Sequence, residues 1–100
     1  MDFSAFKSSL SAGEMPSTLS VLLQALWQDG RGNWEAAHNL VQDLSGKQAA
    51  WIHAYLHRKE GDTGNADYWY RKAGKVRPQV SLGQEWEDLI HALLQDEEPK

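Results

Sequence analysis

Two histidines four residues apart are the part of the sequence best suited to chemistry. His53 and His57 lie on one face of a predicted helix, and Glu60 lies about one turn further along the same side. At this spacing both imidazoles can reach one divalent ion. The segment lacks the glutamate of the HExxH metalloprotease motif, so the spacing is permissive without being specific.

A complete metal site needs a further ligand that the local sequence does not supply. The candidates for a third ligand are His38, Asp62 and Asp67. We therefore treat His53 and His57 as weak metal candidates and name no metal and no other cofactor. Added zinc is expected to bind weakly and to leave the stability nearly unchanged.

A second set of side chains forms a stripe along the same helix. Trp51, Tyr55 and Arg58 are spaced i, i+4, i+7, and aromatic residues and arginine are enriched in binding hot spots. Such a stripe suits an extended acidic or C-terminal peptide whose carboxylate Arg58 would bind. An aromatic stripe at helical spacing is also typical of a core. In that alternative, Arg58 pairs inside the protein with a carboxylate such as Asp62 or Glu85.

Three consecutive aromatic residues follow in the next predicted helix. Tyr68, Trp69 and Tyr70 span about 200° of helix surface, so they cannot all face one core. Arg71 and Lys72 come directly after them and add positive charge that a carboxylate or phosphate could use. In the alternative, the stems of these cations only cover the aromatic edges. The residues predicted to contact a ligand or partner are Trp51, His53, Tyr55, His57, Arg58, Tyr68, Arg71 and Lys72.

The elements that must position these side chains are all predicted to be helices. Glycine or proline recurs where each apolar periodic segment ends, and Asn33, Asp62 and Ser81 are plausible caps. The last helix is expected to direct Trp86, Leu89, Ile90, Leu93 and Leu94 inward and to cover the apolar side left open by residues 62–74. One domain is expected over residues 1–100, made of a lead-in at 1–16, hairpins at 17–46 and 47–80, a capping helix at 81–95 and a solvated tail at 96–100. Within it, helices are expected near 17–28, 33–44, 48–60 and 62–73.

The two central hairpins form an internal repeat. A shift of 29 residues places Ala25 on Ala54, Gly32 on Gly61 and Ala37 on Ala66, with Asn33 on Asp62. Small residues on either side of a turn allow two helices to cross closely.

This pattern resembles the tetratricopeptide repeats. In the second hairpin the matching positions are Ala54, Gly61, Asp62, Ala66, Tyr70, Ala73 and Pro78. The first hairpin matches less fully, and the interval of 29 residues is shorter than that family's usual 34. The segments AAWIHAYLHR and YWYRKAG also look like a group of small uncharacterised bacterial proteins. The tetratricopeptide resemblance implies two stacked antiparallel hairpins, a concave surface that holds partners, and packed, neutral core positions for His53 and His57.

Composition excludes several other classes. The chain has no cysteine, so it has neither disulfides nor thiolate metal sites. Its net charge is −4 with basic residues scattered among acids, which argues against nucleic acid as a partner. The N-terminus has no signal-peptide pattern, and the longest apolar block, LSVLLQALW, is too short to cross a bilayer. No membrane partner and a cytoplasmic location are expected.

These features predict an all-α module that binds a protein or peptide, with a homodimer as a third interpretation. No nucleophile with a base is recognisable, and the turn GDTGN is explained by the repeat. Enzymatic activity is therefore disfavoured. The alternative is a metal-dependent enzyme or small-molecule binder that uses His53, His57, Arg58 and Tyr70.

Overall fold

The computed structural model describes residues 1–97, and these residues contain six α-helices and no strand. The predicted all-α class is therefore confirmed. The helices are α1 (Phe3–Ala12), α2 (Val21–Gly30), α3 (Trp34–Val41), α4 (Lys47–Lys59), α5 (Thr63–Lys72) and α6 (Leu82–Glu97). None of the described helices is long and apolar enough to cross a membrane.

Capping side chains decide where several helices begin. Ser20 accepts a hydrogen bond from the backbone N–H of Leu23, so α2 begins at Val21 and not near residue 17. Asp62 and Ser81 cap α5 and α6 as expected, with bonds from the N–H groups three residues later. Asn33 precedes α3 but makes no cap bond, and its side-chain amide donates to that of Gln28.

Two helix ends differ from the expected positions. Helix α3 ends at Val41, because a helix that continued to Leu44 would leave only two residues to turn the chain into α4. Helix α6 continues to Glu97, so Asp96 and Glu97 of the expected tail are helical. The rest of that tail, residues 98–100, lies outside the described residues.

The turns of the two hairpins have the same backbone geometry. Gly32 and Gly61 adopt positive φ angles of 84° and 87°, a region that costs glycine little. In each turn the backbone N–H of the next residue donates to a carbonyl five residues earlier. Asn33 donates to Gln28, and Asp62 donates to His57. The repeated alanines on either side are fully buried, and they are Ala25, Ala37, Ala54 and Ala66.

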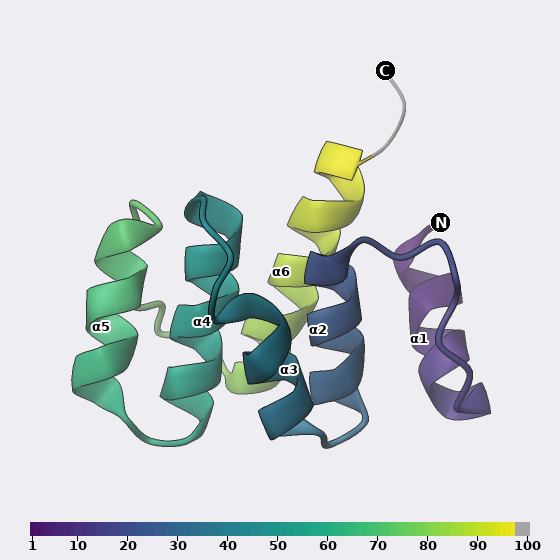
Figure 1. Cartoon of the computed structure of the whole chain (residues 1–100), viewed down its shortest axis with the longest axis horizontal. Helices are drawn as coiled ribbons and strands as arrows, with labels where there is room; N and C mark the ends of the chain where they lie inside the picture. Colours follow the sequence, from purple (N-terminus) through teal and green to yellow (C-terminus); the bar gives the residue numbers. More distant parts are fainter. Residues whose placement is uncertain (98–100) are drawn as a thin grey trace.

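Helix α6 closes the molecule on one side. In Figure 1 it lies behind α2 and α4, whereas α3 lies in front of them and α1 and α5 lie at opposite ends. The sequence suggested that α6 covers the apolar side of residues 62–74. It packs mainly on α4 and α2 instead, and α5 reaches it through Tyr70. The face of α2 and α4 that α6 covers is therefore not open to a partner.

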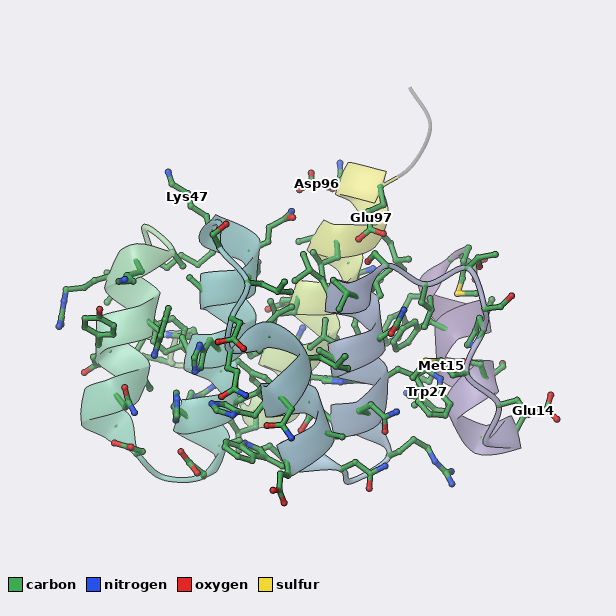
Figure 2. The ribbon with its side chains drawn as sticks, in the orientation of Figure 1. Glu14, Met15, Trp27, Lys47, Asp96 and Glu97 are labelled. Atoms are coloured by element: carbon green, nitrogen blue, oxygen red, sulfur yellow. The ribbon has the colours of Figure 1, made fainter. Side chains whose placement is uncertain are left out.

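Apolar side chains of α6 complete the core. Leu89, Ile90 and Leu93 are at most 1% exposed and pack in one cluster with side chains from α1, α2 and α4. The C-terminal end of α6 is held by two polar contacts, Ser20 to Glu97 at 2.9 Å and Gln48 to Asp96. Figure 2 shows Asp96 and Glu97 on the same side of the molecule as Lys47, where α4 begins.

We predict that Leu89→Ala destabilises the protein by about 2 to 5 kcal/mol, because it removes a fully buried side chain and leaves a cavity between α6 and the hairpins. Val76→Ala is the control, since Val76 is 89% exposed and its truncation should change stability by less than about 0.5 kcal/mol. Urea unfolding measures both. Equal, small effects would show that α6 does not pack on the hairpins in this way.

Candidate functional site

Helix α4 carries most of the predicted site residues and distributes them among three neighbours. Trp51 and Arg58 point to Glu85 of α6, and Tyr55 points to Asp29 of α2. His53 and His57 lie with His38 of α3. The residues that the sequence placed on one helix therefore belong to three separate clusters.

The carboxylate of Glu85 is the centre of the first cluster. It is 1% exposed and accepts hydrogen bonds from the Arg58 Nη1 at 2.8 Å, the Tyr70 hydroxyl at 2.7 Å and the Trp51 Nε1 at 3.1 Å. Arg58 also donates to the carbonyl of Val80. Burial, then the hydrogen bond to Glu85, raises the pKa of Tyr70, so its hydroxyl stays protonated and donates. The internal ion pair that was one alternative for Arg58 is present.

A second buried carboxylate, Asp29, lies at the end of α2. It is 3% exposed and accepts from the Tyr55 hydroxyl at 2.6 Å and the Lys59 Nζ at 2.8 Å. Burial, followed by the bond to Asp29, raises the pKa of Tyr55. Sequence reasoning missed Asp29. The available signal was its position in the repeat, because Asp29 is the equivalent of Arg58 and so faces a similarly buried environment.

The third cluster contains three histidines. His38 Nε2 lies 3.1 Å from His53 Nε2, and the Nδ1 of His57 lies 2.6 Å from the Glu60 Oε1. His53 and His57 are buried, whereas His38 is half-buried. The predicted packed position of both α4 histidines is therefore present. His38, one of three guesses for a third ligand, is the one that joins them.

Two tryptophans flank the histidines. Trp34 stacks on His38 with centroids 4.9 Å apart and planes 8° apart, and Trp69 stacks on His53 at 4.0 Å and 19°. The indole N–H of Trp34 donates to the carbonyl of Leu56 at 2.8 Å, which fixes the first of these rings. The sequence signal for Trp34 was its position four residues before His38 on one helical face.

Two histidines of this cluster, His53 and His38, are held in environments that disfavour the charged imidazolium. Burial, followed by the neighbouring His57 and His38, lowers the pKa of His53 to about 4. Burial and then His57 lower the pKa of His38, against an opposing effect of Glu60. At neutral pH these two imidazoles are therefore uncharged, with ring nitrogens able to accept a proton or bind a metal ion.

The remaining predicted residues lie on the outer side of α5 and in the loop that follows. Tyr68 is 44% exposed, and the Nζ of Lys72 lies 5.1 Å from its ring centroid and 5.2 Å from that of Trp69. Arg71 is exposed and has no ion pair within residues 1–97. A pocket of about 480 Å³ lies beside it. Its lining includes Asp67, Tyr70, Arg71, Lys75, Val76 and Arg77.

The four residues of the alternative enzyme site do not form one cluster. Arg58 and Tyr70 bind Glu85, and His53 and His57 contact each other and His38. What remains chemically available is the histidine cluster and the basic outer side of α5. Comparisons of the chain with protein-family models, curated proteins and solved structures found no match.

We predict that Arg58→Ala lowers the free energy of unfolding by about 2 to 4 kcal/mol, because it leaves the Glu85 carboxylate buried without its cation. This loss of stability is at the lower end of the range for buried ion pairs, because the Arg58 side chain is still 19% exposed and solvent screens its charge. Arg71→Ala removes the same side chain from an exposed position and should change stability by less than about 0.5 kcal/mol. Urea unfolding of both variants tests this, and an unaffected Arg58→Ala variant would refute the structural role of the pair.

Proposed function

We propose that the protein is a binding module for an acidic segment of a partner protein. The observation that carries this proposal is the pocket of about 480 Å³ at the end of α5, which has three cations in its lining, Arg71, Lys75 and Arg77. Residues 71–77 hold four of the ten Lys and Arg residues and no acid, in a chain whose net charge is −4. We call the surface formed by Tyr68, Trp69, Arg71, Lys72, Lys75 and Arg77 the basic surface.

The cations of the basic surface differ in whether they already contact an acid or an aromatic ring of the protein. Arg77 is paired with Asp67 at 3.0 Å, and the Lys75 Nζ lies 4.1 Å from the ring centroid of Trp51. Arg71 has no such neighbour within residues 1–97, and its planar guanidinium suits bidentate binding of a carboxylate. Arg71 is therefore the best candidate to bind the partner's carboxylate first, with Lys75 beside it.

Aromatic side chains give this surface a second means of recognition. Tyr68 is exposed and Trp69 is half-buried, and the Nζ of Lys72 lies 5.1 Å and 5.2 Å from their ring centroids. Tyrosine, tryptophan and arginine are the residue types that most often carry binding energy in interfaces. An acidic segment with interspersed apolar residues would use the cations and the aromatic rings together, so we propose such a segment and not a purely acidic one.

The stripe of Trp51, Tyr55 and Arg58 is not part of the proposed surface. Glu85 occupies the position of the carboxylate that the stripe was expected to bind, and α6 covers the surrounding face. A peptide could reach these side chains only if α6 left its place, which would expose Leu89, Ile90 and Leu93 to water.

We also propose that the two hairpins are a short tetratricopeptide-like array. The support is the equivalent turn geometry at Gly32 and Gly61 and the complete burial of the repeated alanines. In such an array the last hairpin offers its outer helix to the surroundings. The basic surface is on that outer helix and the loop that follows it, at the end of the molecule opposite α1 (Figure 1).

The test uses a fluorescein-labelled peptide of alternating glutamate and leucine, with its glutamine counterpart as the uncharged probe. Fluorescence anisotropy should show binding of the acidic peptide that weakens as salt rises, because exposed charges are screened. The double substitution Arg71→Ala with Lys75→Ala should weaken binding about ten- to a hundredfold, since charge-assisted hydrogen bonds are lost.

Lys7→Ala is the matched control, because it removes an exposed cation from α1 at the other end of the molecule. It should leave the affinity within about twofold, well inside the effect of a charged contact. Equal binding of the acidic and glutamine peptides, or full affinity in the double variant, would contradict the proposal. Concentration-dependent sedimentation of the protein alone would favour the homodimer in its place.

A further inference from the structure

Three imidazoles from two hairpins surround a common point. The ring centroids are 4.8 Å apart for His38 and His53, 4.8 Å for His53 and His57, and 5.3 Å for His38 and His57. One ring nitrogen from each histidine lies within 4.8 Å of the others. The three ring centroids therefore form a nearly equilateral triangle. One ring comes from α3 and two come from α4.

The dimensions of this triangle match those of a bound transition-metal ion. Zinc lies about 2.0 to 2.1 Å from each histidine nitrogen, so a tetrahedral arrangement places the nitrogens about 3.3 Å apart and the ring centroids about 5 Å apart. The observed Nε2 to Nε2 distance between His38 and His53 is 3.1 Å, and all three centroid distances are close to the expected value. The ligand nitrogen of His57 lies within 4.8 Å of those of His38 and His53.

The surroundings supply the supporting contacts that metal-binding histidines usually have. Glu60 accepts from the Nδ1 of His57 at 2.6 Å, which leaves the Nε2 of this ring free to face the ion. The indole rings of Trp34 and Trp69 lie against His38 and His53 and restrict their rotation. A contact between His38 and His53 alone would be explained by one N–H···N hydrogen bond. That bond does not account for the third ring and its carboxylate.

We propose that His38, His53 and His57 bind one divalent transition-metal ion of the zinc class through three imidazole nitrogens. Glu60 acts as a positioning residue for His57, and a solvent molecule takes the fourth coordination position on the half-buried His38 side. Imidazole donors favour zinc, cobalt, nickel and copper over calcium or magnesium, which prefer oxygen ligands. The weak binding expected from the sequence was based on the lack of a third ligand, and His38 supplies that ligand in the folded chain.

Cobalt and zinc, each added alone to chelator-treated protein, are the probes. Calorimetric titration should give one ion per chain, and bound cobalt should show the visible absorption of a four-coordinate ion. With zinc at about a hundredfold above its dissociation constant, the melting temperature should rise by roughly 10 to 20 °C.

The chain offers a matched control for the ligands. His91 is the fourth histidine, is exposed on α6 and stacks on Phe3, far in sequence from the cluster. His38→Gln should abolish the one-to-one zinc binding and the cobalt spectrum, whereas His91→Gln should leave both unchanged. Glu60→Gln should weaken zinc binding by about ten- to a hundredfold.

Glu60→Gln also keeps the test decisive if His38→Gln does not fold, because the Glu60 side chain is 38% exposed and its replacement should preserve the helical circular dichroism. Lack of one-to-one binding in the native protein would overturn the proposal. So would full zinc affinity in Glu60→Gln, full zinc affinity in a folded His38→Gln variant, or loss of binding in His91→Gln, which would place the ion near the N-terminus.

Discussion

The burial of one carboxylate organises the contacts between the last helix and the second hairpin. A carboxylate removed from water is costly unless donors satisfy it, and Glu85 has three donors, from Trp51, Arg58 and Tyr70. Two of these come from α4 and one from α5. The position of α6 is therefore set by polar contacts at its start and by apolar packing of Leu89 and Leu93 further along.

This arrangement separates the inside of the protein from the surfaces that a ligand could use. Helix α6 covers one face of α2 and α4, so the residues best placed for recognition lie on the outer side of α5 and between α3 and α4. Trp69 belongs to both places, because it stacks on His53 and lies beside Lys72. A metal ion held by the histidines would add positive charge next to the basic surface and would strengthen the binding of acidic groups that we propose for it.

Local patterns in the sequence predicted the helices well, because caps, glycines and apolar spacing act over a few residues. Asp62 and Ser81 cap as expected, and the equivalence of Gly32 and Gly61 appears in both turns. Prediction was poorer where a contact joins distant segments. The partner of Arg58 was left between Asp62 and Glu85, which are 4 and 27 residues away, and spacing along one helix cannot choose between them.

The histidines illustrate the same limit. The spacing of His53 and His57 placed them on one face, but the identity of a third neighbour depends on how α3 packs across α4. Sequence spacing could therefore name His38 only as one of three candidates. Asp29 was missed because an acidic residue at the end of an apolar helix is usually solvated, and only the contacts of Tyr55 and Lys59 explain its burial.

Asp29 and Arg58 occupy equivalent positions in the two hairpins but carry opposite charges. An α6 displaced by one repeat would place Glu85 against Asp29, so that two carboxylates would share a buried site with no arginine between them. The correct placement instead pairs each carboxylate with its own cation, Lys59 or Arg58. The sign of the charge thus distinguishes the two hairpins and favours one docking register for the closing helix.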